Sequence, residues 1–367
     1  MTVSDELRRT PLFETHVSLG GRMVPFAGWE MPIQYSSILE EARAVRSKAG
    51  LFDVSHMGRV DFRGADAASV LDRSLSVSVP GLRIGRARYN IICDEAGGII
   101  DDCIVYRRDE QRFLLIPNSA NTGAVLEWVS RWVSSADDVQ IDEVTSDLAM
   151  IAHQGPEAAS MLSDLTPADI ASMRPFAAVE TEVGGVPTLL ARTGYTGEDG
   201  FELILPSDAA PDIWRALMDR GAVPCGLGAR DVLRLEAGLL LHGNDMDRST
   251  NPYEAGLERF VNPDREGYTA GEALRRARDD GVSRRMVGFN MVGRGIARHG
   301  YAITHGSEQI GEVTSGSHSP TLDRSIGLGY VPTGFSAEGS RVQIDVRGRS
   351  VEAEVTALPF YSRKRSA

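Results

Sequence analysis

The sequence predicts an α+β protein with more than one domain, whose last part is built from strands alone. Strand-like stretches alternate with amphipathic helices as far as residue 282, and beyond it short strands and glycine turns continue to the end. A chain of 367 residues is also longer than one hydrophobic core usually grows. We therefore expect two or three domains, with a substantial cleft between them and a C-terminal domain of barrel or sandwich type.

Helices are predicted where apolar residues recur at helical spacing between start and stop signals. In residues 36–50, Ser37 and Glu40 have the spacing of a capping box, and Gly50 supplies the stop. Further helices are expected at residues 66–75, 121–135, 157–165, 229–241 and 270–281.

Strands are predicted by runs rich in β-branched and aromatic residues between turn residues. Residues 87–108 should form a hairpin, because the turn sequence DEAGG interrupts a long apolar run. Single strands are expected at 59–64, 112–118 and 147–155, paired strands within 187–205, and C-terminal strands at 284–291, 300–306, 309–316, 325–332 and 341–360.

Composition excludes several classes of protein. No apolar run is long enough to span a bilayer, and the N-terminus has no apolar signal core, so we expect no membrane association and a cytoplasmic location. Cys93, Cys103 and Cys225 are an odd set without CxxC spacing, which argues against a disulfide framework or a cysteine zinc site. A formal charge of -12 argues against nucleic acid as a main partner, the short basic tail SRKRSA being the exception.

The segment GGIIDDCIVY, residues 97–106, places two acids inside an otherwise buried strand. The two-residue period of a strand directs Asp101 and Asp102 to opposite faces, so at most one can face a given pocket. A carboxylate that faces a poorly hydrated cavity is costly unless paired, and such groups are more often functional than structural. Alternatively, both acids lie in a turn or at a strand end and bond to the backbone.

The segment RTGYTGEDGFEL, residues 192–203, combines three glycines with several acids. Its glycines allow the backbone to approach a ligand, but the acids would repel phosphate and no phosphate-loop pattern is present. Glu202 could accept two hydrogen bonds from an amino-pyrimidine edge, and Tyr195 offers a stacking face. The alternative is a tight hairpin with solvated acids.

Two arginines stand four residues apart in the segment GLGARDVLRLEAGLLLHGNDMD, residues 226–247, within its predicted helix of residues 229–241. Arg230 and Arg234 therefore share one helical face and could hold a dicarboxylate tail. Such arginines more often satisfy structural carboxylates, and this is the interpretation we prefer for Arg234.

No motif for metal hydrolysis or for acyl-enzyme chemistry is present. His56 lies beside Met57 in FDVSHMGRV, at an expected helix-to-strand junction. A lone histidine of this kind is usually a packed or capping residue. Nucleophilic catalysis by the protein itself is not indicated.

Several long motifs occur together in a familiar order: FAGWEMPIQY, GLFDVSHMG, GGIIDD, RTGYTGEDGFE, GLGARDVLRLEAGLLLHGNDMD, NPYEAGL and TSGSHSPTL. In these motifs the chain resembles the glycine cleavage system T-protein family, from about residue 10 to residue 361. The resemblance implies a three-domain cloverleaf around a central funnel that binds tetrahydrofolate, with no metal and no redox cofactor. Its expected domains are residues 1–56 with 144–249, 57–143 with 250–283, and 284–367.

The resemblance also implies roles for individual residues. Asp102 is expected to face the folate as the catalytic carboxylate, while Asp101 turns toward the scaffold. Folate contacts are expected from Met57, Tyr89, Asn118, Tyr195, Glu202 and Arg230, with Arg363 at the glutamate tail.

The chemistry implied by the resemblance is aminomethyl transfer. The carbon is carried on the lipoyl arm of the H protein, the partner of the family, and it reaches tetrahydrofolate as 5,10-methylene-tetrahydrofolate with release of ammonia. Folate N5 makes the attack, so the protein has to hold N5 and N10 in place, and Asp102 can orient the folate and take up its amine proton.

Two positions depart from the family pattern. Arg259 stands where an aromatic residue, typically Trp, is usual, and His242 stands where Tyr is usual. These changes leave open a folate-dependent demethylase or methyltransferase of the same superfamily that acts on a small methylated compound. A folate-binding protein without transfer activity is a third possibility, against which Asp102 and the complete GYTGEDGFE segment argue.

Overall fold

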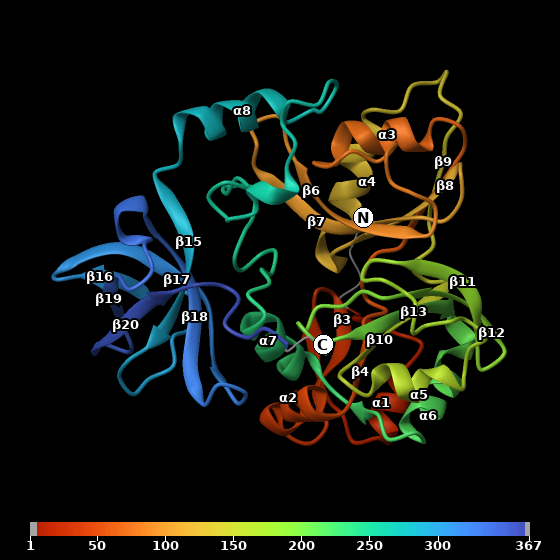
Figure 1. Cartoon of the computed structure of the whole chain (residues 1–367), viewed down its shortest axis with the longest axis horizontal. Helices are drawn as coiled ribbons and strands as arrows, with labels where there is room; N and C mark the ends of the chain where they lie inside the picture. Colours follow the sequence, from red (N-terminus) through yellow and green to blue (C-terminus); the bar gives the residue numbers. More distant parts are fainter. Residues whose placement is uncertain (1–5, 364–367) are drawn as a thin grey trace.

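Three lobes surround a common centre in the computed structural model, which describes residues 6–363 (Figure 1). Two lobes combine helices with a sheet, and the third is a closed barrel of six strands. The predicted α+β class with an all-β C-terminal domain is confirmed. None of the helices in the described residues is long and apolar enough to cross a membrane.

The first lobe is built on a sheet with strand order β11-β12-β13-β10-β4-β14. Leu51 and Phe52 are neighbours in one of its strands but belong to different apolar clusters, so both faces of this sheet are covered. Its strands are β4 (Gly50–Asp53), β10 (Leu148–Gln154), β11 (Ala178–Val183), β12 (Val186–Ala191), β13 (Gly200–Pro206) and β14 (Val223–Pro224).

A second, three-stranded sheet and five helices complete the first lobe. This sheet comprises β1 (Arg8–Arg9), β2 (Arg22–Phe26) and β3 (Trp29–Gln34), in the order β1-β3-β2. The helices are α1 (Phe13–Ser18), α2 (Ile38–Ser47), α5 (Ala158–Ser163), α6 (Ala210–Met218) and α7 (Leu227–Glu236), with the 3₁₀ turn η2 (Ser207–Ala209) before α6.

Helix α2 begins as predicted and ends earlier. The Ser37 hydroxyl accepts a hydrogen bond from the Glu40 backbone N–H at 3.3 Å. The helix ends at Ser47, and Gly50 is the first residue of β4 rather than the helix stop. A Cβ at Gly50 would lie 2.5 Å from the Val45 side chain and 2.8 Å from the Cys225 sulfur, so close packing explains this glycine.

The second lobe contains the predicted hairpin. Its sheet has the order β6-β7-β8-β5-β9, and Ile91 of β6 pairs with Asp102 of β7. The strands are β5 (Val60–Arg63), β6 (Arg86–Cys93), β7 (Ile99–Arg107), β8 (Arg112–Pro117) and β9 (Gln140–Glu143), accompanied by α3 (Ala67–Ser74), η1 (Ser119–Asn121) and α4 (Thr122–Ser130).

The barrel follows a helical segment, η3 (Glu258–Phe260) and α8 (Gly271–Asp280). Its strands close in the order β15-β18-β17-β16-β19-β20 around a core that includes Phe289, Ile303 and Val342. They are β15 (Arg284–Met291), β16 (Ala302–His305), β17 (Glu308–Ser319), β18 (Arg324–Pro332), β19 (Arg341–Asp345) and β20 (Ser350–Thr356), with η4 (Thr333–Phe335) after β18.

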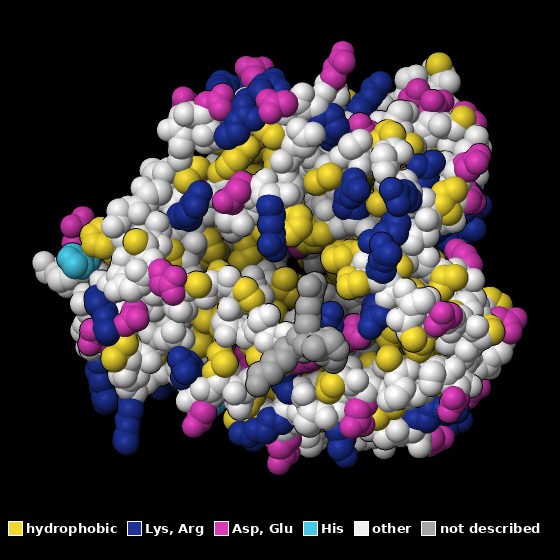
Figure 2. All heavy atoms as spheres, viewed as in Figure 1, with side chains coloured by type: hydrophobic (Ala, Val, Ile, Leu, Met, Phe, Trp, Pro, Cys, Tyr) yellow, Lys and Arg dark blue, Asp and Glu magenta, His cyan; other side chains and the backbone are white. Residues whose placement is uncertain are grey.

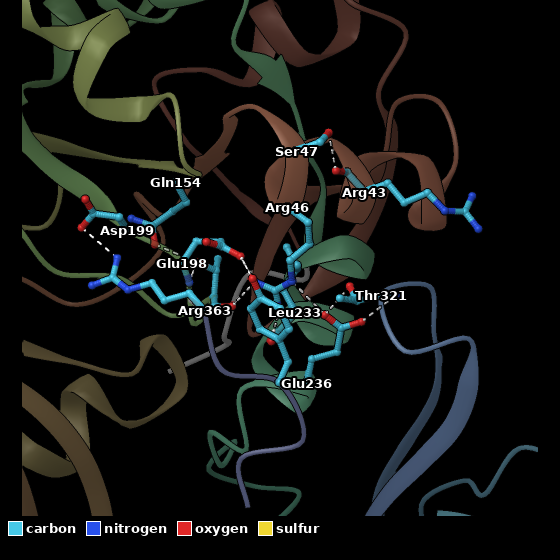
Figure 3. Close-up of polar contacts among 12 residues, drawn as sticks. Arg43, Arg46, Ser47, Gln154, Glu198, Asp199, Leu233, Glu236, Thr321 and Arg363 are labelled. Carbon is cyan, nitrogen blue, oxygen red and sulfur yellow. Dashed lines mark hydrogen bonds and ion pairs between the residues drawn. The ribbon is translucent and has the colours of Figure 1, made fainter. Parts of the chain in front are cut away.

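The strands of each sheet fall within the residue ranges expected for the three domains, while the domain boundaries themselves stay a prediction. A buried ion-pair network joins the first lobe to the barrel. Arg46 of α2 lies 2.7 Å from Glu236 of α7, whose carboxylate also accepts a hydrogen bond from the Thr321 hydroxyl at 2.9 Å (Figure 3). These contacts fix the helix that carries Arg230.

Candidate active site

The two adjacent acids in the hairpin of the second lobe, Asp101 and Asp102, have different surroundings. Asp101 is completely buried, and its carboxylate accepts hydrogen bonds from the Asn118 backbone N–H at 2.9 Å, the Asn118 amide at 2.8 Å and the Asn121 amide at 2.6 Å. Asp102 is half-buried. Its carboxylate accepts from the Tyr89 hydroxyl at 3.1 Å and the Asn118 amide at 2.9 Å. The scaffold thus occupies Asp101, while Asp102 keeps acceptor capacity for a ligand.

The ionisation of one of these two carboxyl groups also depends on that of the other. Burial and the neighbouring Asp102 raise the pKa of Asp101, and burial raises the pKa of Asp102. Because two carboxylates so close together resist double ionisation, the pair retains a proton to a higher pH than ordinary aspartates do. A group of this kind can accept or relay a proton near neutral pH.

His242 extends this network into the loop after α7. Its Nε2 lies 3.2 Å from the Ile99 carbonyl oxygen, which can only accept, so Nε2 carries the proton. Its Nδ1 then accepts from the Asn121 amide at 2.9 Å. Since the same amide donates to Asp101, a continuous chain of hydrogen bonds runs from His242 to Asp102 through Asn121, Asp101 and Asn118.

Glu202 lies in the first lobe as a buried acid with local partners. Its carboxylate accepts hydrogen bonds from the Thr193 hydroxyl at 2.5 Å and the Tyr106 hydroxyl at 3.4 Å. The residue is 7% exposed. Burial raises the pKa of Glu202. The predicted alternative, a hairpin with solvated acids, is therefore wrong for this residue.

Tyr195 and Arg230 lie against each other. The Arg230 guanidinium is 4.8 Å from the centre of the Tyr195 ring, and the Tyr195 hydroxyl donates to the Leu240 carbonyl. One terminal nitrogen of Arg230, Nη1, is buried without a hydrogen-bond partner among the described residues. A buried donor without a partner is expensive, so it is a natural contact for a ligand.

Arg234 has the structural role that we preferred for it. Its Nη1 lies 2.5 Å from buried Asp245, and Nη2 donates to the Ser315 hydroxyl of the barrel at 2.7 Å. Of the two arginines on this helical face, Arg234 is therefore structural, while Arg230 has a buried donor without a partner among the described residues.

His56 and Met57 lie in a turn between β4 and β5, so the expected helix-to-strand junction is wrong. Phe52 and Asp53 before them belong to strand β4 and not to a helix, because they pair with β10 inside the first sheet. His56 is buried edge-to-face against Phe26, with ring centres 5.5 Å apart, and burial lowers its pKa to about 3. His56 is thus a packed, neutral residue, while Met57 is half-buried beside an apolar cluster that the first two lobes share.

Arg363, at the end of the described chain, is paired with an acid of the glycine-rich segment. Its Nη1 lies 3.0 Å from Asp199 (Figure 3). Asp199 also pairs with Arg192. This places Arg363 beside the segment that carries Tyr195 and Glu202. A role at the glutamate tail stays a prediction.

Arg259, one of the two departures, lines a cavity of about 810 Å³ together with Tyr89 and Phe260. Tyr89 also contacts Asp102, so the cavity lies next to the acid pair. Figure 2 shows basic side chains gathered around a central hollow of the molecule.

The residues present suit a pterin-bearing ligand. A buried carboxylate on Glu202, an aromatic ring on Tyr195 and the unpartnered donor of Arg230 are complementary to a heterocycle with amide and amino groups and an acidic tail. Within residues 6–363, no group of three or more His, Cys, Asp or Glu side chains is placed to hold a metal ion.

Sequence reasoning missed four partners of these groups: Asn121, His242 as a member of the acid network, Tyr106 and Thr193. Tyr106 and Thr193 lie inside the quoted segments GGIIDDCIVY and RTGYTGEDGFEL, but neither segment indicates that the two hydroxyls meet at Glu202. Asn121 and His242 are 121 residues apart, and no local pattern links them.

Comparison with known proteins covers almost the whole chain. The family profile described as "GCVT N-terminal domain" matches residues 12–265, and that described as "Glycine cleavage T-protein C-terminal barrel domain" matches residues 284–362. A curated aminomethyltransferase of Rubrobacter xylanophilus is 49% identical over 361 residues, covering 98% of this chain and 96% of the relative. One from Bacillus subtilis is 42% identical over 363 residues, covering 97% and 100%.

A solved structure agrees with the sequence comparisons. The glycine cleavage system aminomethyltransferase T of Bartonella henselae superposes with a TM-score of 0.91 at 34% identity, covering 97% of this chain and 98% of that chain.

Proposed function

Since the chain belongs to the glycine cleavage T-protein family of aminomethyltransferases, we propose that it transfers the aminomethyl carbon of a lipoyl adduct on the H protein to tetrahydrofolate at Asp102. The observation that carries this proposal is the pair of acids with separate surroundings. Asp101 is saturated by scaffold donors, and half-buried Asp102 is held by Tyr89 and Asn118. A cytoplasmic location stays a prediction.

The reaction needs no protein nucleophile. In the proposed reaction the methylene carbon gains bonds to folate N5 and N10 and loses its bonds to the amine nitrogen and to the lipoyl sulfur. The two protons that leave N5 and N10 end on the departing ammonia and thiolate. Asp102 accepts a proton from the folate amine and stabilises positive charge that develops at the transferred carbon.

The other residues bind and position the folate. Glu202 accepts N–H bonds from the pterin, Tyr195 supplies a wall, and Arg230 attracts the acidic part of the molecule. Met57 lines the apolar side of the proposed folate site. Holding reacting atoms in an attack geometry can contribute about 7–11 kcal/mol in favourable cases.

The methyltransferase alternative rested on Arg259 and His242. His242 forms two hydrogen bonds, one of them to Asn121 of the acid network, and the shared name of the curated relatives does not favour the alternative.

The test is a product assay on the purified protein. With tetrahydrofolate and aminomethylated H protein we expect ammonia and methylene-tetrahydrofolate in equal amounts. Methyl-tetrahydrofolate formed from small methyl donors without ammonia would favour the methyltransferase instead. Folate binding without either product would contradict transfer activity.

A further inference from the structure

His242 is a titratable group in the acid network to which the proposed function assigns no role. It stands where a tyrosine is usual in the family, and an imidazole, unlike a phenol, changes its charge between about pH 5 and 8. The half-buried ring lies between the Ile99 carbonyl of β7 and the Asn121 amide of η1. Its charge therefore changes close to the two acids of the hairpin.

The side-chain amide of Asn121 donates hydrogen bonds in two directions. One goes to the Asp101 carboxylate at 2.6 Å, and the other goes to Nδ1 of His242 at 2.9 Å. The second bond requires an Nδ1 without a proton, so the imidazole is neutral in this arrangement. The first bond requires an Asp101 oxygen that can accept.

A proton added to Nδ1 of His242 does not fit this arrangement, because two N–H groups would then face each other. Rotating the Asn121 amide by half a turn removes the conflict, since its oxygen then accepts from Nδ1. The same oxygen then faces Asp101 at the position from which the amide nitrogen donated. Two acceptor oxygens that close repel each other unless the Asp101 carboxyl is protonated and donates. A proton on His242 thus favours a proton on Asp101.

Asp101 is suited to hold that proton. Burial and the charge of the neighbouring Asp102 raise the pKa of Asp101. Its two hydrogen bonds from Asn118 do not depend on the Asn121 amide, so they persist when that amide rotates. The carboxyl therefore stays in place in both arrangements.

The reversed arrangement changes the electrostatic surroundings of Asp102. A neutral Asp101 no longer repels a negative charge on Asp102, and a positive His242 attracts it. Asp247 faces His242 from its own loop. The ionisable groups that act on the acid pair or respond to it are Tyr89, Cys103, Tyr195 and His242, and of these only His242 can become a cation.

We propose that His242 is a positioning residue of the reaction: its protonation and that of Asp101 occur together through the Asn121 amide, and the resulting state keeps Asp102 ionised below neutral pH. The two protons come from water, one to Nδ1 and one to the Asp101 carboxyl, and they return to water when the pH rises. This inference rests on the proposed function, in which an ionised Asp102 accepts the folate amine proton.

The experiment measures the single-turnover rate of methylene-tetrahydrofolate formation by the full-length chain from about pH 5.5 to 8.5. Each profile is scaled to the same protein's rate at the alkaline end. His242→Tyr installs the usual family residue, whose hydroxyl can accept from Asn121 but takes up no proton in this range. Asn121→Ala keeps both titrating groups and removes the amide that joins them. His305→Gln, at an exposed histidine of the barrel, is the control.

We expect the rate of His242→Tyr to begin its fall on the acidic side about one pH unit above that of the wild type. At about pH 6 its scaled rate should then be about tenfold lower than that of the wild type. Asn121→Ala should show the same displacement, and His305→Gln should follow the wild-type profile. Circular dichroism and the tetrahydrofolate dissociation constant, measured at both ends of the range, separate this effect from a loss of folding or of binding.

Scaled profiles of His242→Tyr and wild type that coincide would overturn the inference. A displacement in His242→Tyr that is absent in Asn121→Ala would show that the histidine acts through its charge alone, and this result would overturn the coupling. Failure of the proposed function would look different, because no protein would then release ammonia from aminomethylated H protein at any pH.

Discussion

The side-chain amide of Asn118 donates to the Asp102 carboxylate at 2.9 Å while its own backbone N–H is bonded to Asp101. This residue, directly after β8, therefore sets the orientation of both acids of β7. The arrangement fixes Asp102 rigidly, as a group that positions a reacting ligand must be. It also couples the ionisation of the two carboxyls.

The first prediction concerns stability and pH. Burial and repulsion raise the pKa of Asp101, so the folded state holds a proton that the unfolded chain has released, and the free energy of unfolding falls as pH rises through that pKa. Asp102→Asn removes the repulsion. Urea unfolding at pH 5.5 and 8 should show a smaller fall for this variant than for wild type, by about 1 kcal/mol.

The matched control is Asp208→Asn, an exposed acid of the first lobe, which should follow the wild-type pH dependence. Parallel curves for wild type and Asp102→Asn would show that the two acids titrate independently.

The second prediction concerns Glu202. Glu202→Ala should weaken tetrahydrofolate binding by about a hundredfold, since it removes the buried carboxylate that accepts the pterin N–H groups. Tyr106→Phe deletes a 3.4 Å contact to the same carboxylate and a 3.2 Å contact to the Thr193 hydroxyl, but it keeps the carboxylate, so it should change the dissociation constant less than threefold. Isothermal titration calorimetry measures both. Unchanged affinity in Glu202→Ala would remove Glu202 from the site.

The third prediction concerns His242. His242→Phe keeps an aromatic ring but removes the acceptor for the Asn121 amide, so we expect kcat to fall about tenfold with little change in KM for folate. His242→Gln, which can supply an oxygen acceptor, should restore part of kcat. Asn244→Ala, at an exposed position of the same loop, is the control. A change confined to thermal stability would indicate a purely structural histidine.

The fourth prediction concerns the buried Arg234–Asp245 pair. Asp245 accepts from Arg234 at 2.5 Å and from two hydroxyls of the barrel, those of Thr314 and Ser315. Asp245→Ala leaves the guanidinium buried without its main partner, which should cost about 3–5 kcal/mol of unfolding free energy.

Asp231 pairs with the same arginine from an exposed position, so Asp231→Ala should cost less than about 1 kcal/mol. Urea denaturation distinguishes these two variants, and equal costs would contradict the structural assignment.

Local patterns accounted for the elements whose signals lie within a few residues. The hairpin turn is one case: Asp94 accepts the Ala96 and Gly98 N–H groups, and Gly97 adopts φ of +89°. The opposite directions of Asp101 and Asp102 follow from the pleat alone. The identity of the inward acid came from family resemblance and not from spacing.

Other features could not be predicted from short segments, or were missed although a local signal was present. Helix α6 was not among the expected elements, although Ile213, Trp214 and Leu217 have helical spacing and bury one face. Helix α7 ends at Glu236 instead of continuing to 241, because Gly238 turns the chain with φ of +66°. The contact of Asn121 with His242 depends on how two lobes pack, which no short segment encodes.

The central claim is that Asp102 acts on the reacting ligand rather than holding the fold. The most direct measurement compares the single-turnover rate and the tetrahydrofolate dissociation constant of wild type and Asp102→Asn, with folding checked by circular dichroism. The account predicts folate affinity within about tenfold of wild type and a loss of at least about a hundredfold in rate. A folded variant that forms methylene-tetrahydrofolate at the wild-type rate would contradict it.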